Sequence, residues 1–209
     1  MKGLPFIVFI VLLLPLRAQQ DTTVASTCSG IWAPAAGTTL LAGGALLTFT
    51  PEMKSWAVDL RDAVQADGHS KLHFDDYLEY VMPATPVALN LCGLKSRHEF
   101  KKLALLEGGS YLLGVALLEA GKFGFGVPRP DNNAPTSFPS GHTFSATAAA
   151  EILRREYGEE YPWMAVAGYT VATLVGAMRI YNNRHWVGDV LAGAGLGILS
   201  VSAVYWLFD

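Results

Sequence analysis

Long apolar stretches separated by short polar connectors dominate the pattern along the chain. The two clearest, residues 162–180 and 186–208, carry one charged residue each, Arg179 and Asp189. As α-helices they would be roughly 28 and 34 Å long, which matches the hydrocarbon thickness of about 30 Å. Aromatic residues stand at the ends of both stretches, as is typical of a membrane–water interface. The pattern therefore predicts two membrane-spanning helices near the C-terminus.

Weaker apolar segments predict further helices. Residues 103–121 form a third candidate, interrupted by two glutamates, and residues 74–91 and 140–153 are weaker still. Residues 33–50 are apolar but short and glycine-rich, so we expect them to re-enter the membrane or lie on its surface. The predicted fold is all-α, a compact membrane-embedded bundle of about five or six helices. The alternative is a soluble bundle with long buried helices.

The N-terminus is typical of a secretory signal peptide covering residues 1–18. Lys2 precedes the apolar run 4–16, and Leu16-Arg17-Ala18 offers a small residue at the cleavage position. The alternative is an uncleaved anchor helix. Beyond it we expect residues 19–73 to form an extracytoplasmic segment with a short apolar helix, and residues 74–209 to form the helical core.

Basic connectors predict the topology. Lysines and arginines gather in residues 94–102 and at Arg154 and Arg155, which the positive-inside rule places in the cytoplasm. The connecting helices would then bring residues 122–139 and 179–189 together on the extracytoplasmic face.

Composition excludes several classes of protein. The formal net charge is −3 and only 16% of residues are charged, against roughly 25% in an ordinary soluble domain. The chain has no basic stripe, so we expect no nucleic-acid partner. Two cysteines are too few for a disulfide scaffold or a four-cysteine zinc site. A GxxxG pattern at Gly193 and Gly197 indicates either a dimer seam, which leaves the oligomeric state open, or close packing inside the bundle, the interpretation we favour.

Ionisable residues gather at the ends of the apolar segments, where they are costly and therefore candidates for function. Lys122, Arg129 and Arg179 would place three cations on one face, a pattern suited to phosphate oxygens. Ser140 stands where a helix should begin, and Gly141 lets an anion approach the free backbone amides there.

His185 and Asp189 are four residues apart and share one helix face. Asp189 is placed to accept a hydrogen bond from one ring nitrogen, which leaves the other free as a nucleophile. Three chemistries fit: a metal site of His142, His185 and Asp189; a serine hydrolase using Ser140; and metal-free phosphoryl transfer. The neighbouring cations would repel a metal ion, and the serine lacks a G-x-S-x-G elbow. Only phosphoryl transfer gives every residue a role.

The spacing K-x6-R-P, then P-S-G-H, then R-x5-H-x3-D between Lys122 and Asp189 resembles the three-part signature of the type-2 phosphatidic acid phosphatase superfamily. That group includes bacterial acid phosphatases and vanadium haloperoxidases. One position departs from it, because Met178 stands where the family often has serine.

The resemblance implies a role for each residue of the signature. His185 would be the nucleophile that forms a phosphohistidine, Asp189 would orient it, and His142 would donate a proton to the leaving oxygen. The phosphoryl group would be bound by Lys122, Arg129, Ser140, Gly141 and Arg179. No metal or other cofactor is implied.

The resemblance also implies the class of substrate. A phosphate pocket beside apolar helices suits a phospholipid or isoprenyl phosphate or pyrophosphate, and the membrane is the expected partner. We expect a bacterial inner-membrane protein whose site faces the periplasm. Alternatives are a soluble periplasmic acid phosphatase of broad specificity, a vanadate-using haloperoxidase, and a non-catalytic membrane protein that binds anionic lipids. Glu119 is expected either to pair with Lys122 or to face water, and residues 52–76 to form a loop with an amphipathic helix able to cap the site.

Overall fold

The computed structural model describes residues 25–209 apart from 67, 69 and 133, so the predicted signal peptide lies outside the described residues. These residues form helices and connectors without a β-strand, which confirms the all-α class. The helices are α1 (Ala25–Phe49), α2 (Pro51–Gln65), α3 (Phe74–Leu91), α4 (Phe100–Phe125), α5 (Gly141–Tyr157), α6 (Pro162–Tyr181) and α7 (Val187–Phe208). The described chain thus has seven helices rather than five or six, because the amphipathic α2 forms a separate helix.

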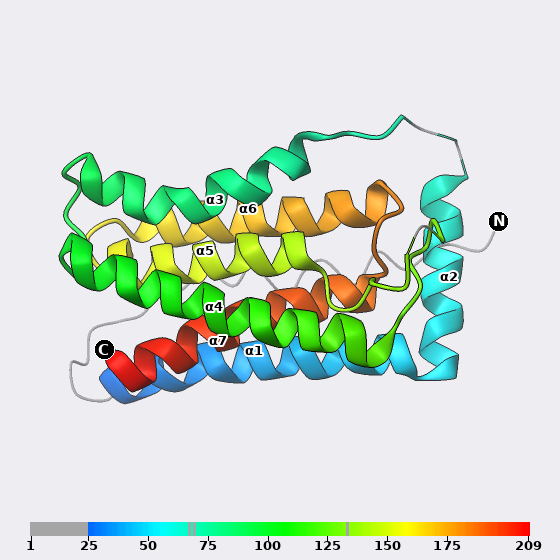
Figure 1. The fold of residues 1–209 in the computed structure, drawn as a ribbon, viewed down its shortest axis with the longest axis horizontal. Helices are drawn as coiled ribbons and strands as arrows, with labels where there is room; N and C mark the ends of the chain where they lie inside the picture. Colours follow the sequence, from blue (N-terminus) through cyan, green and yellow to red (C-terminus); the bar gives the residue numbers. More distant parts are fainter. Residues whose placement is uncertain (1–24, 67, 69, 133) are drawn as a thin grey trace.

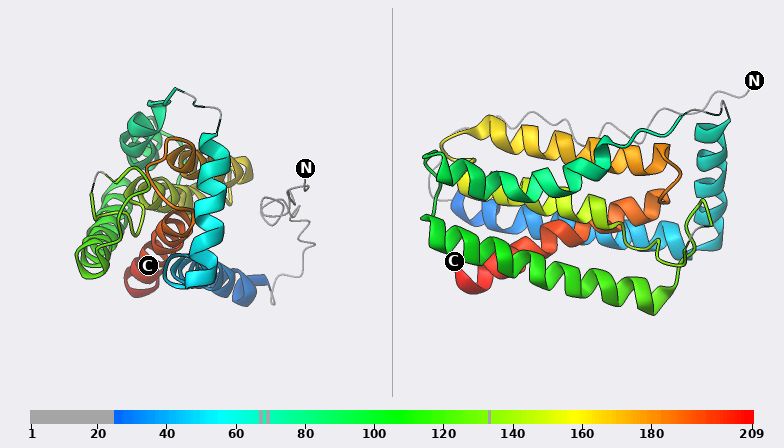
Figure 2. Two further views of the ribbon diagram at one scale, coloured as in Figure 1. Left: turned by 90° about the vertical axis from the view of Figure 1, so that its right-hand side faces the viewer. Right: turned by 45° about the horizontal axis from the view of Figure 1, so that its top comes forward.

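Six of the helices run along one direction, and α2 lies across the end of the bundle (Figures 1 and 2). Connectors α3–α4 and α5–α6 are at the opposite end from α2 (Figure 1). The 126–140 segment and the α6–α7 turn both lie toward the α2 end (Figure 1). Adjacent helices therefore bring residues 122–139 and 179–189 to one end of the molecule, as the connector pattern predicts.

Glycines allow α7 to pack closely against two of its neighbours, α1 and α5. A Cβ atom on Gly195 would lie 2.4 Å from the backbone nitrogen of Leu41 in α1. A Cβ on Gly193 would lie 2.4 Å from the carbonyl oxygen of Ser140, at the start of α5. One on Gly197 would lie 2.8 Å from the carbonyl oxygen of Phe144. The GxxxG pattern therefore serves close packing within the chain.

Within the part of the chain that the structure describes, four helices are long and apolar enough to cross a membrane: Ile31–Phe49 within α1, then α4, α6 and α7. The first of these differs from the expectation of a short helix at residues 33–50, because α1 is 25 residues long and lies along α7 (Figure 1). Its glycines do not interrupt it. Gly44 instead allows α7 to pack closely against α1, since a Cβ there would lie 2.5 Å from the backbone nitrogen of Ala192. The boundary expected between an extracytoplasmic segment, residues 19–73, and a helical core, residues 74–209, stays a prediction.

Candidate functional site

His185 lies in the turn before α7, and its side chain is buried beside the first turn of that helix. Its Nδ1 is 3.6 Å from Asp189 Oδ2, which is longer than a hydrogen bond. The hydroxyl of Ser137 lies between the two groups. It donates to Asp189 Oδ2 at 2.5 Å and stands 3.4 Å from His185 Nδ1. The direct hydrogen bond expected between His185 and Asp189 is therefore not formed in this structure, and Ser137, which the sequence analysis did not single out, lies between the two groups.

The surroundings of His185 favour its neutral ring. Burial lowers the pKa of the imidazole, and the charges of Arg179 and Arg129 act in the same direction. Asp189 opposes them, but the pKa of His185 remains below its ordinary value of 6.5. A neutral imidazole retains the lone pair that a nucleophile needs.

The start of α5 differs in one respect from the sequence prediction. The amide of Ser140 donates to the carbonyl oxygen of Asp189 at 2.9 Å, and its hydroxyl accepts from Thr143 Oγ1 at 3.0 Å. The Ser140 amide is therefore not available to an anion, because it helps to hold α7 against α5. The amides that follow, beginning with Gly141, have no acceptor within the helix.

Lys122 lies close to this helix start. Its Nζ is 3.8 Å from the position that a Cβ atom on Gly141 would occupy. The same ammonium group pairs with Glu119 Oε1 at 2.8 Å, which is one of the two expectations for that glutamate. The free amides of α5 and a lysine charge thus share one small region.

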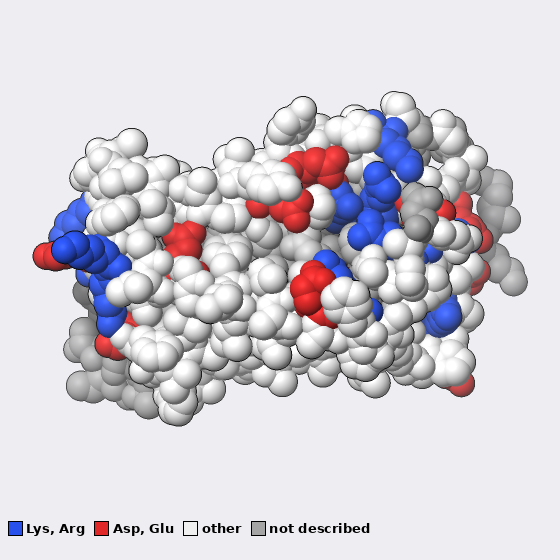
Figure 3. Space-filling view, in the orientation of Figure 1, with Lys and Arg blue, Asp and Glu red and all other residues white. Residues whose placement is uncertain are grey.

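Two arginines contribute buried donors that have no hydrogen-bond partner. The Nε atoms of Arg129 and Arg179 are both buried and unpaired. Burial and the charge of Arg179 lower the pKa of the Arg129 guanidinium. Because buried polar groups nearly always find partners, these donors indicate an anionic ligand. Figure 3 shows one group of lysines and arginines toward the α2 end of the molecule, bordered by two groups of acidic residues, and a second group at the opposite end.

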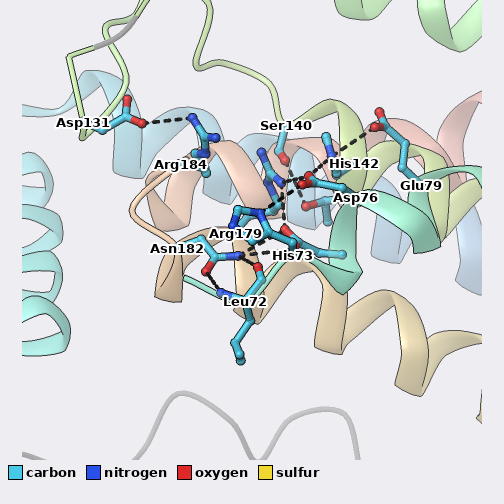
Figure 4. Close-up of polar contacts among 12 residues, drawn as sticks. Leu72, His73, Asp76, Glu79, Asp131, Ser140, His142, Arg179, Asn182 and Arg184 are labelled. Carbon is cyan, nitrogen blue, oxygen red and sulfur yellow. Dashed lines mark hydrogen bonds and ion pairs between the residues drawn. The ribbon is translucent and has the colours of Figure 1, made fainter. Parts of the chain in front are cut away.

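Acidic residues at the start of α3 reach into the same site. Asp76 Oδ1 accepts from Arg179 Nη1 at 3.1 Å and lies 3.1 Å from His142 Nε2 (Figure 4). Glu79 Oε2 lies 3.0 Å from the same imidazole nitrogen (Figure 4). Buried Asp75 accepts from Arg179 Nη1 at 2.7 Å. The sequence prediction placed a capping segment here but assigned none of these carboxylates to the site.

A signal for these residues was present in the sequence. Asp75 and Glu79 are four positions apart and Asp76 and Glu79 three, so all three lie near one face of α3. They begin a helix that is otherwise mostly apolar, where charges are costly and need partners.

The alternative chemistries find less support in the geometry. Within the described residues, no three His, Cys, Asp or Glu side chains gather as ligands for a metal ion. The Ser140 hydroxyl contacts Thr143, and the serine beside His185 is Ser137. A hydrolase triad built on Ser140 therefore lacks its nucleophile–base contact.

Several known proteins are similar to this chain in sequence or in fold. Lipid A 1-phosphatase of Porphyromonas gingivalis is 36% identical over 98% of this chain and 50% of its own length, so the chain spans half of that relative. The crystal structure of Aquifex aeolicus LpxE, 25% identical, matches 71% of this chain and 94% of its own with a TM-score of 0.54. A transmembrane PAP2-type phosphatidylglycerolphosphate phosphatase from Bacillus subtilis, 21% identical, matches 84% of this chain and 96% of its own with a TM-score of 0.51, and shares the fold.

The profile of the PAP2 superfamily matches residues 103–209, just over half of the chain. This range contains the whole signature from Lys122 to Asp189, most of α4 and the last three helices. The chain therefore belongs to the PAP2 superfamily.

Proposed function

We propose that this protein is a metal-independent membrane phosphatase that removes phosphate from a lipid phosphate or isoprenyl pyrophosphate through a phosphohistidine intermediate. One observation carries the proposal. A buried imidazole, His185, sits beside Asp189 and Ser137, at the end of the bundle where Arg129 and Arg179 hold unpaired buried donors. Nucleophile and anion-binding groups are thus present together.

In the first step the phosphoryl group binds to Arg129, Arg179 and Lys122 and to the amides that begin at Gly141. These positive groups offset the charge of the equatorial oxygens, which is the main contribution that a protein makes to phosphoryl transfer. His185 Nε2 attacks phosphorus, a P–N bond forms, and the P–O bond to the leaving group breaks. The leaving oxygen takes a proton from His142 Nε2.

The contacts of Nδ1 prepare His185 for this attack. Ser137 donates its own proton to Asp189, so its oxygen is free to accept a hydrogen bond from Nδ1–H. That arrangement keeps the proton on Nδ1 and the lone pair on Nε2. In the second step a water molecule, deprotonated by His142, attacks the phosphohistidine, the P–N bond breaks, and inorganic phosphate leaves.

The membrane-type helices support a lipid substrate. Among the described residues four helices are long and apolar enough to span a bilayer, and the relative that is 36% identical is named a lipid A 1-phosphatase. Lysine and arginine residues of the α3–α4 connector and of the last turn of α5 lie at the end opposite the site. By the positive-inside rule we place the protein in a bacterial inner membrane with its site facing the periplasm.

A phosphate-release screen tests the proposal. The purified full chain in detergent should release phosphate from lipid phosphates or isoprenyl pyrophosphates in preference to soluble phosphomonoesters. His185→Ala should abolish release while the helical circular dichroism spectrum is unchanged. Full activity of this variant would refute the covalent step. Activity should survive EDTA, and loss of activity that a divalent metal restores would favour a metal mechanism.

A further inference from the structure

The acidic residues of α3 contact the proton donor of the proposed reaction. Asp76 Oδ1 and Glu79 Oε2 lie 3.1 and 3.0 Å from the same atom, His142 Nε2. Both carboxylates are partly open to solvent, with 50% and 28% of their side chains exposed, so they border the mouth of the site. Neither residue belongs to the signature that identifies the family.

Their position relative to a substrate follows from the proposed function, on which this inference rests. The oxygen that receives the proton must lie at hydrogen-bond distance from His142 Nε2, about 3 Å. Asp76 and Glu79 contact that same atom at a similar distance, so their carboxylates lie within about 6 Å of the leaving oxygen. Both carboxylates therefore border the leaving group, and Asp76 also reaches Arg179, which binds the transferred phosphoryl group in the proposed function.

The balance of charge differs between the two sides of the site. Lys122, Arg129 and the free amides of α5 serve the transferred phosphoryl group, and Arg179 stands between the two sides, because it also pairs with Asp75 and Asp76. On the side of His142, the cation of Arg179 is shared by Asp75 and Asp76, and Glu79 adds a third carboxylate. The leaving-group side thus has more negative than positive fixed charge.

We propose that Asp76 and Glu79 determine substrate specificity by selecting phosphate monoesters with an uncharged leaving group over diphosphates. In a diphosphate the leaving group is itself a phosphate, and its negative charge would meet two carboxylates. An alcohol leaving group carries no such charge. One that bears hydroxyl groups beside the ester oxygen, such as a sugar or glycerol, gains charge-assisted hydrogen bonds to the same carboxylates.

A pair of substrates with one apolar chain isolates this effect. Farnesyl phosphate and farnesyl diphosphate differ only in what leaves, and kcat/KM for phosphate release is measured for both with the purified full chain. The wild-type protein should favour the monophosphate. Glu79→Gln should raise the ratio of diphosphate to monophosphate kcat/KM by about tenfold, since like charges at this distance are strongly unfavourable. Asp76→Asn, at a half-exposed position that tolerates substitution, should shift the ratio in the same direction.

Glu119→Gln is the matched control. It also removes one carboxylate near the site, but that carboxylate pairs with Lys122, which serves the transferred phosphoryl group and not the leaving group. Its ratio should stay close to the wild-type value. The specificity role would be overturned if the ratio were unchanged in both Glu79→Gln and Asp76→Asn, or if Glu119→Gln shifted it equally. Either result would leave the proposed phosphatase function standing. Absence of release from every lipid phosphate tested would overturn the proposed function and this inference together.

Discussion

Replacing Asp76 with alanine should make the protein bind inorganic phosphate more tightly. Asp76 Oδ1 accepts a hydrogen bond from Arg179 Nη1 at 3.1 Å and contacts His142 Nε2 at 3.1 Å. A phosphate oxygen bound in the proposed site needs the same donors. The carboxylate therefore holds the place of the ligand, and binding has to break its contacts.

The magnitude follows from exposure. Half of the Asp76 side chain is exposed, although Arg179 is almost fully buried. A hydrogen bond to a charged group contributes about 1.5–3 kcal/mol when it is buried, whereas an exposed ion pair contributes about 0.2–1 kcal/mol. Discounted for solvent screening, the contact costs a ligand about 1 kcal/mol, which corresponds to roughly fivefold in affinity. Burial would raise the pKa of Asp76, but the hydrogen bond from His142 and the charge of Arg179 outweigh it, so the pKa is lowered and the carboxylate is ionised at neutral pH.

The assay is the inhibition constant of inorganic phosphate against phosphate-ester turnover, supported by calorimetric titration of the purified protein. Arg179 keeps its contact with Asp75 at 2.7 Å in the variant, so the fold should persist. Asp62→Ala is the control, because Asp62 is similarly exposed and pairs with Arg61 at 2.7 Å on α2. Phosphate binding that is weaker than wild type in Asp76→Ala, or no tighter than in the control, would refute the reasoning.

Three further predictions follow from the site and its packing. Because His185 must be neutral to attack and burial lowers its pKa below 6.5, kcat/KM should fall with decreasing pH only below that value, and a decline that begins above it would contradict the assignment. Ser137→Ala removes the hydroxyl between His185 and Asp189, so kcat should fall roughly tenfold to a hundredfold at unchanged thermal stability, whereas wild-type kcat would show that the hydroxyl is idle. Gly193→Ala should lower the free energy of unfolding by about 1–3 kcal/mol, because its Cβ would meet a backbone oxygen at 2.4 Å. Gly43→Ala has nothing within 4 Å of its Cβ and should leave the melting temperature in detergent unchanged, so equal effects of the two would argue against close packing of α7.

The positions of three apolar helices could be predicted from the sequence almost to the residue, whereas α1, α4 and α5 extend beyond the apolar runs 33–50, 103–121 and 140–153. The apolar runs at 74–91, 162–180 and 186–208 correspond to helices Phe74–Leu91, Pro162–Tyr181 and Val187–Phe208. A bilayer sets both the length and the apolarity of a helix that crosses it, so hydropathy alone locates such helices. The amphipathic α2 gives no long apolar run, and its existence as a separate seventh helix became evident only in three dimensions.

The candidate site divides in the same way. The sequence by itself determined which chemical groups are available, because it sets His185 four residues before Asp189 and places the cations at fixed spacing around them. Only the tertiary structure decided which partners these groups meet. Ser137 reaches Asp189 across 52 residues of chain, and Asp76 reaches His142 across 66. Local periodicity describes one helix at a time, whereas these contacts depend on how the start of α3 and the 126–140 segment pack against the other helices.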